Sequence, residues 1–254
     1  MTIPFTFSNT PTGIRTLRNL LSSIGLVVSN GVTDEDFFFG FSAFNMYFYF
    51  KRFNSDRFRI YVISYNHATV PPSIVLGSVV WFWCPTVYEC AGWLIYNSTG
   101  FSVIIRHNLN EHFPYDGFYV GLLSKFASSD PDTFVLCGSG SIKSRQLFIH
   151  PLVPVVANGI ICVSGTVLNP VWFYLVSDST TLNEGDNGDD EGKDVVGYKL
   201  KVLDQFHVLR GYLPFIYSVA NSYLNTEQRL ACYDSLFICF RSRDSAVCIP
   251  EVLT

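Results

Sequence analysis

The chain has 254 residues, of which 48% are hydrophobic, 16% aromatic and 15% charged, and its net charge is −4. Charged residues make up about a quarter of a typical soluble domain, so we expect this apolar chain to bury surface against other subunits. The negative net charge, without any Lys/Arg-rich run, argues against tight non-specific binding of nucleic acid through many phosphate contacts. A weak or shared RNA contact stays open.

Membrane crossing by a helix takes about 18 consecutive apolar residues. The stretch from Ser73 to Cys84 is too short. The stretch from Gly159 to Val176 contains Asn169-Pro170 and several hydroxyls, and it predicts two strands with a turn between them. The N-terminus has neither the basic nor the apolar region of a signal peptide. We therefore expect no membrane partner, and synthesis in the cytosol or excision from a longer chain.

The first predicted elements are an extended, Pro-bounded segment and one amphipathic helix. Thr12 is the expected N-cap and Gly25 the C-terminal stop. Arg15 and Arg18 are expected to face outward, and residues 1–25 form an N-terminal extension. The apolar positions of the helix, spaced three or four residues apart on one face, are Ile14, Leu17, Leu21 and Ile24.

An aromatic stretch from Phe44 to Asn66 predicts two antiparallel strands joined near residues 53–56. The acidic segment TDED at residues 33–36 before it is expected to cap one helical turn. Alternation along the second strand predicts a buried face formed by Phe58, Ile60 and Val62. The cations of the stretch are expected at the exposed end of the hairpin, at a sheet rim or a subunit contact; they are Lys51, Arg52, Arg57 and Arg59.

The remainder of the chain predicts short strands separated by Gly, Pro, Asn, Asp and Ser at fairly even spacing, a pattern typical of a β-sandwich or barrel. These strands run through segments such as GWLIYN, FSVIIRHN, QLFIHPLV, GYKLKVLDQF and DSLFICFRS. The segment 226–234 is a possible short helix. Residues 179–194 are polar, acidic and Gly-rich, and they predict a surface loop. We expect a single all-β domain over residues 1–254.

No motif in the sequence specifies a chemical reaction. The seven cysteines are scattered and odd in number, and we predict reduced, buried thiols and no zinc or disulfide framework. The five histidines lack metal-binding spacing, and Gly138–Ser144 is neither a nucleophile elbow nor a phosphate loop. We predict no catalytic residue, no cofactor and no metal. Two alternatives stay open: a β-sandwich with an aromatic ligand pocket, and a small cysteine- or histidine-dependent enzyme.

The order of these features resembles capsid proteins of picornavirus-like viruses such as dicistroviruses and iflaviruses. In that family a short helix precedes an aromatic strand that runs into a basic turn and an outgoing strand. The helix would match at Arg15, Leu17, Leu20 and Leu21, the aromatic strand at residues 47–50, and the basic turn at Arg57 and Arg59. The segment GTVLNPVWFYLVSD resembles the family's Asn-Pro-initiated strand. The family's Asp-Asp-Phe cleavage triplet is absent, so no catalytic role is carried over.

The resemblance implies an eight-stranded jelly roll, an antiparallel β-sandwich with short helices and long loops. It implies a structural subunit of a small icosahedral positive-strand RNA virus capsid, made in the host cytoplasm and located in the virion. Its partners would be other capsid subunits, with packaged RNA as a weak contact. The subunit-contact candidates are the six cations Arg15, Arg18, Lys51, Arg52, Arg57 and Arg59.

Overall fold

The computed structural model describes residues 1–42, 46–54, 57–63, 75–83, 89–106, 115–138, 155–163, 166–168, 172–181, 196–204, 206–219, 227–232, 235–241 and 246–251. The elements in the first third of the chain are β1 (Thr2–Phe7), α1 (Thr10–Ser23), β2 (Val27–Asn30), β3 (Asp36–Phe41), β4 (Met46–Asn54), β5 (Arg57–Ile63) and β6 (Val75–Trp83). The middle third contains β7 (Cys90–Tyr96), β8 (Gly100–Arg106), β9 (Tyr115–Leu122), β10 (Thr133–Gly138), β11 (Val155–Val163) and β12 (Thr166–Leu168). The last third contains β13 (Trp172–Thr181), β14 (Val196–Leu203), β15 (Leu209–Val219), β16 (Arg229–Cys232), β17 (Ser235–Arg241) and β18 (Ala246–Pro250).

Helix α1 is the predicted amphipathic helix, although its start lies earlier than expected. Its N-cap is Asn9, whose Oδ1 accepts a hydrogen bond from the backbone N–H of Thr12 at 3.0 Å. Thr12 as N-cap is therefore wrong, because an Asn followed by a proline in the first turn already provides both start signals. The end is confirmed: Gly25 follows the helix with a φ of +89°, a left-handed conformation that glycine adopts at little cost.

The strands form one five-stranded sheet and one long path of hydrogen-bonded strands, and every pair of described strands is antiparallel. The small sheet has the order β2-β3-β4-β5-β6. The long path has the order β1-β7-β8-β9-β10-β11-β13-β14-β15-β18-β17-β16, with β12 beside β11. The all-β antiparallel fold is thus confirmed. The jelly-roll order is not, because strands from β7 to β15 pair mainly with their neighbours in sequence.

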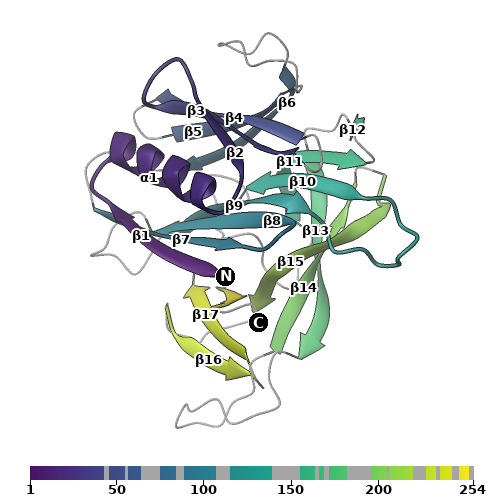
Figure 1. The fold of residues 1–254 in the computed structure, drawn as a ribbon. Coiled ribbons are helices and arrows are strands. Elements are labelled where there is room, and N and C mark those ends of the chain that lie inside the picture. The colour runs from purple at the N-terminus through teal and green to yellow at the C-terminus, as the bar shows by residue number, and fades with distance from the viewer. Residues whose placement is uncertain are drawn as a thin grey trace.

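The long path folds over itself, so strands β7–β10 form a central layer that is buried on both faces (Figure 1). One face packs on the five-stranded sheet, and α1 closes the side of this core. The other face packs on β14, β15, β17 and β18. Burial on both faces explains the nearly continuous apolar sequences of β7 and β8, CAGWLIY and GFSVIIR. Two hydrophobic cores therefore share one sheet.

Aromatic rings fill the first core. Phe37 stacks on Phe50 with ring centroids 4.8 Å apart, and Phe39 stacks on Phe48 at 4.9 Å. These pairs lie directly opposite one another across β3 and β4, where side chains of neighbouring strands approach most closely. All four side chains are buried. Much of the aromatic excess that suggested subunit contacts is therefore used inside the monomer.

Several sequence-based expectations differ from the structure. Residues 33–36 form a turn and the start of β3, not a capped helical turn. The segment 226–234 contains strand β16 and not a helix, and strand β15 was not predicted at all. Strand β15 contains Gly211 and Pro214 and has an irregular register against β14. These residues interrupt the alternation of apolar and polar positions by which a strand is predicted from sequence.

The expectations for the acidic segment are tested only at its ends. Residues 179–181 belong to β13 and pair with β14, so the strand extends three residues into the predicted loop. Thr181 lies opposite Val196, and the remaining residues of the segment, like those of QLFIHPLV, lie outside the described residues.

The two ends of the described chain lie side by side, since the Thr2 hydroxyl donates to the Pro250 carbonyl at 3.2 Å (Figure 1).

Candidate subunit-contact surfaces

The two predicted contact residues on α1 lie on its outer side. Arg15 is exposed, and Arg18 is partly buried because its Nη1 donates to Oδ1 of Asn30 in β2 at 2.9 Å. Arg18 therefore joins the helix to the edge of the small sheet. Arg15 is the more accessible of the two cations for an external partner.

The predicted basic hairpin is formed by β4 and β5. Lys51 is exposed, whereas Arg52 forms a 2.6 Å ion pair with Glu35, in the turn that precedes β3. Arg57 lies opposite Asn54, and Arg59 lies opposite Lys51. The side chains of Arg57 and Arg59 lie outside the described residues, so their predicted place at a rim stays a prediction.

The predicted buried face of β5 is confirmed at one position. Ile60 is fully buried in the first core. Phe58 and Val62 are on the same strand, but their side chains lie outside the described residues. Their burial stays a prediction.

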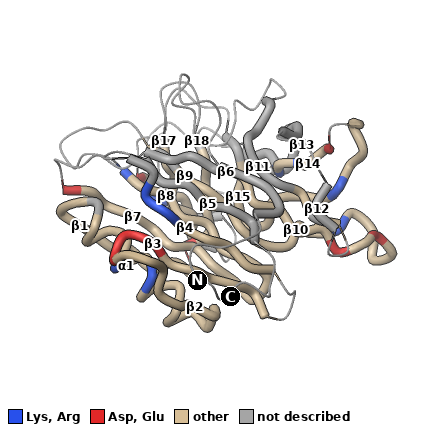
Figure 2. Tube along the Cα trace, turned by 90° about the horizontal axis from the view of Figure 1, so that it is seen from above, with Lys and Arg blue, Asp and Glu red and all other residues tan. Residues whose placement is uncertain are grey.

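Acidic residues lie between the basic residues of α1 and those of β4 (Figure 2). Glu35 pairs with Arg52, and the buried Asp36 carboxylate accepts hydrogen bonds from the backbone and hydroxyl of Thr33 and from the Tyr49 hydroxyl. The expected basic contact residues are therefore part of a mixed surface. The described part of this surface therefore offers no continuous row of cations for RNA phosphates.

A second surface was not predicted, and we call it the aromatic end. It contains three exposed apolar side chains, Phe126, Phe206 and Val208, together with Tyr212 and Lys199. Phe126 is 67% exposed and Phe206 74% exposed. The connection between β9 and β10 carries Phe126, and the turn between β14 and β15 carries the other two. Both project from the same side of the molecule (Figure 1).

Backbone pairing fixes the β9–β10 connection against β15. Ser124 and Tyr212 exchange two backbone hydrogen bonds, each 2.9 Å long. The ring of Phe126 then stacks on that of Tyr212 with centroids 6.2 Å apart, and Nζ of Lys199 lies 6.0 Å from the centre of the Tyr212 ring. These contacts therefore hold the β9–β10 connection, with Phe126, beside β14 and β15.

A buried carboxylate holds the β14–β15 turn. The Asp204 side chain is 1% exposed and accepts hydrogen bonds from the backbone N–H groups of Phe206 at 2.8 Å and Val208 at 3.0 Å. Its other oxygen accepts from Nε and Nη2 of Arg210 at 2.9 and 2.6 Å. Burial opposes ionisation of this carboxyl, but the donors from Val208, Arg210 and Phe206 outweigh burial and hold the pKa of Asp204 below its ordinary value.

The same turn places His207 at a φ of +61°, a left-handed conformation that is uncommon for residues other than glycine. The Asp204–Arg210 ion pair and the hydrogen bonds to Asp204 thus fix the backbone from which the exposed Phe206 side chain projects. The sequence signal for this turn was an Asp directly after an apolar strand, which favours an Asx-type turn. We predicted instead that the strand continued through Phe206.

A polar cluster connects the second core to the C-terminal strands. Nη1 of Arg106 forms a 2.5 Å ion pair with Glu227, and the Tyr115 hydroxyl donates to the same carboxylate at 2.9 Å. Nε of Arg106 is buried without a hydrogen-bond partner. Glu227 is 112 residues from Tyr115 in sequence, so the cluster ties distant segments together. Most polar atoms of the cluster form hydrogen bonds or ion pairs with one another, which is typical of a structural contact.

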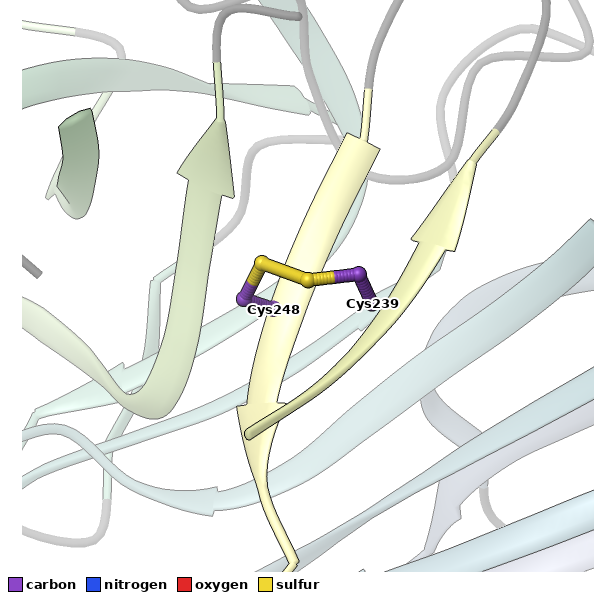
Figure 3. The surroundings of a disulfide bond; sticks show 2 residues. All are labelled: Cys239 and Cys248. Atoms are coloured by element: carbon purple, nitrogen blue, oxygen red, sulfur yellow. A yellow bond between two sulfur atoms is a disulfide. The ribbon is translucent and has the colours of Figure 1, made fainter. Parts of the chain in front are cut away.

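The cysteines correct one expectation. Cys239 and Cys248 lie opposite each other on β17 and β18 and form a disulfide (Figure 3). The prediction of reduced thiols is therefore wrong for this pair, because antiparallel pairing places the two Cα atoms 4.3 Å apart. Cys90 and Cys137 are buried thiols, as expected. The side chains of Cys84, Cys162 and Cys232 lie outside the described residues.

Burial raises the pKa of the Cys137 thiol to about 12, so at neutral pH it lacks the thiolate that a cysteine nucleophile needs. We expect Cys90 and Cys137 to stay unmodified by a maleimide reagent at pH 8 in the native protein and to react fully in guanidinium chloride. Peptide mass spectrometry measures the labelling at each site. Complete labelling of native Cys137 within seconds would contradict its burial and favour the cysteine-enzyme alternative.

Within the part of the chain that the structure describes, no group of three or more His, Cys, Asp or Glu side chains could hold a metal ion. No helix among the same residues is long and apolar enough to span a membrane. No protein-family model matches the chain, and no curated protein matches it.

Proposed function

We propose that this protein is a structural subunit that assembles with other subunits, in the specific form of a capsid subunit of a small icosahedral positive-strand RNA virus. The capsid form follows from the sequence resemblance. The aromatic end is the structural observation that carries the assembly role. The partners are sister capsid subunits, with RNA as a weak contact, and the location is the virion.

Large apolar side chains that a rigid turn holds in water are suited to binding another protein. Aromatic residues are enriched at protein interfaces, and a few buried anchors supply most of the binding free energy. Phe206 and Phe126 fit this description, since each exposes most of its side chain. Because Asp204 and Arg210 already fix the turn, binding would order few additional residues, which favours affinity.

A pocket for an apolar ligand is the weaker alternative. It was suggested by the aromatic content of the chain, but the described rings of β3 and β4 stack on one another inside the first core. Rings in van der Waals contact leave no room for a ligand between them. Among the described residues, the exposed aromatic side chains are Phe126 and Phe206, which lie on loops at the aromatic end.

Replacing Phe126 and Phe206 together by serine should weaken self-association or particle assembly at least tenfold, because two apolar anchors are lost. Sedimentation velocity over a wide concentration range measures association, and negative-stain electron microscopy shows whether shells form. Leu236→Ser, which removes a single exposed apolar side chain on β17, is the control and should leave association unchanged. A monodisperse monomer at every concentration, alone and with co-expressed sister subunits, would overturn the proposal.

A further inference from the structure

The turn between β7 and β8 contains the sequence Asn97-Ser98-Thr99, which has the Asn-X-Ser/Thr pattern of an acceptor for an N-linked glycan. No other asparagine of the chain has this pattern. Asn97 and Ser98 are exposed, and Thr99 is partly buried. The pattern also occurs by chance, so the geometry of the turn and the compartment in which the chain folds decide its meaning.

The side-chain oxygen of Asn97 holds this turn. Its Oδ1 accepts hydrogen bonds from the backbone N–H and the hydroxyl of Thr99 at 2.9 and 3.0 Å, and from the backbone N–H of Gly100 at 2.9 Å. Asn97 forms turns of this Asx type readily because its short side chain reaches the following backbone groups. No described residue accepts a hydrogen bond from Nδ2 of Asn97.

A glycan on Asn97 is compatible with the folded turn, because it is bonded to Nδ2 and leaves Oδ1 to its three donors. The opposite side of the turn is packed. A Cβ atom at Gly100 would lie 2.6 Å from the Tyr119 hydroxyl oxygen, and the Thr99 carbonyl accepts from the backbone N–H of Leu122 at 2.9 Å. The turn is therefore fixed against β9 while the Asn97 side chain lies in solvent, where a bulky modification is tolerated.

A second, independent observation concerns the compartment in which the chain folds. Cys239 and Cys248 form a disulfide, and both residues are fully buried. Disulfides persist in secreted proteins and in the lumen of the endoplasmic reticulum, and they are rare in the cytosol. The thiols of Cys90 and Cys137 are buried, which protects them from oxidation in such a compartment. N-linked glycans are added to proteins that enter the same lumen.

We propose that Asn97 carries an N-linked oligosaccharide, added as the chain enters the lumen of a eukaryotic secretory compartment. The donor is an oligosaccharide bonded through C1 of its first sugar to a lipid pyrophosphate. Nδ2 of Asn97 forms the new bond to C1, the bond between C1 and the pyrophosphate oxygen breaks, and Nδ2 gives up one proton as the lipid pyrophosphate leaves. No oxidant or reductant takes part in this transfer.

The inference goes beyond the proposed function. It keeps assembly through the aromatic end and replaces the cytosolic synthesis that the resemblance implies. Entry into the lumen needs a targeting signal, which a longer precursor would supply. Excision from a longer chain is one of the two origins that the sequence leaves open.

The test is to produce the 254-residue chain behind a cleavable secretion signal in eukaryotic cells. Glycopeptide mass spectrometry, with and without peptide N-glycosidase, should find one glycan at Asn97 in most molecules. Asn97→Asp should lose the glycan and keep the turn, because a carboxylate oxygen accepts the same three hydrogen bonds. Thr99→Ser keeps the acceptor pattern and the hydroxyl, so it is the matched control and should remain glycosylated.

An unmodified Asn97 in chain that has entered the lumen would overturn the inference, whether the chain is secreted or retained in the cells. So would a glycosylated chain that lacks the Cys239–Cys248 disulfide while Asn97→Asp forms it, because the glycan would then be incompatible with the fold. The same chain made in the cytosol without the signal should lack the disulfide. Complete disulfide formation there would remove the evidence for an oxidising compartment and overturn the inference.

Particle assembly separates this inference from the proposed function. Shells formed by the cytosolic chain, together with an unmodified Asn97 in the luminal chain, would overturn the glycan and leave the assembly role. A luminal chain that is glycosylated at Asn97 and stays monomeric with and without sister subunits would support the glycan and overturn the assembly role.

Discussion

Replacing Phe48 by alanine should lower the free energy of unfolding by about 3–5 kcal/mol, the usual range for removing a phenylalanine from a well-packed core. Phe48 is fully buried. Its ring contacts three other rings, those of Phe39, Phe134 and Phe41, with centroids 4.9, 5.6 and 6.4 Å away. Alanine would leave a cavity between the two sheets that these rings, held on different strands, cannot readily fill.

Guanidinium chloride unfolding followed by far-ultraviolet circular dichroism measures this loss. Phe206→Ala is a matched control, because it removes the same side chain from a site that is mostly in water, and it should change the free energy of unfolding by less than about 0.5 kcal/mol. Equal losses in the two variants would contradict the stacked core between β3–β4 and β10. A much smaller loss for Phe48→Ala would mean that the core repacks.

The elements that the sequence predicts well are those with a regular pattern and clear boundaries. Helix α1 combines a three- and four-residue apolar spacing with Gly25 at its end. Strands such as β7 and β8 are continuous apolar runs between polar turns. Strand β16 was predicted as a helix because RLAC is too short to show a period, and its pairing with β17 decides its conformation.

The layer structure could not be predicted from the pattern of single strands. Alternation shows that a strand has a buried face, but it does not show which strand lies beside it. The strand order here follows the chain from β7 to β15, whereas the resemblance implied the crossed order of a jelly roll. Burial of β7–β10 on both faces depends on the long path folding over at β11, which involves contacts between distant residues.

At the candidate surfaces, too, some exposed residues could be predicted from the local sequence and others depend on tertiary contacts. Exposure of Arg15 and Lys51 follows from their position opposite apolar faces, and it was predicted. Exposure of Phe206 was not, because an apolar residue after a strand is normally assigned to the core. Only the turn formed by Asp204 places it in water. The ion pair of Arg52 likewise depends on a neighbour 17 positions away.

Replacing Asp204 by asparagine should lower the free energy of unfolding by about 3 kcal/mol at pH 7, because it leaves the Arg210 guanidinium without its buried partner. Asparagine has nearly the same shape, and its side-chain oxygen can still accept from both backbone N–H groups, so the loss reports mainly on the interaction with Arg210. Asp132→Asn is the matched control: that carboxylate pairs with Lys125 at 2.9 Å but is 63% exposed. Exposed pairs contribute about 0–1 kcal/mol, so the control should change little.

The effect of Asp204→Asn should also depend on pH, in a direction that follows from the pKa of the carboxyl. The folded protein holds the pKa of Asp204 below its ordinary value of 3.8, so the unfolded chain takes up a proton first as the pH falls. The stabilisation is therefore fully present above about pH 4 and decreases as the pH falls through the folded pKa.

The wild type loses this contribution in acid, and the Asp204→Asn variant never has it. The difference in unfolding free energy should thus be constant from pH 7 to about pH 5 and shrink below pH 4. A difference that grows in acid would show that Asp204 is protonated more readily in the folded chain, and the hydrogen-bonded turn that presents Phe206 would then be wrong.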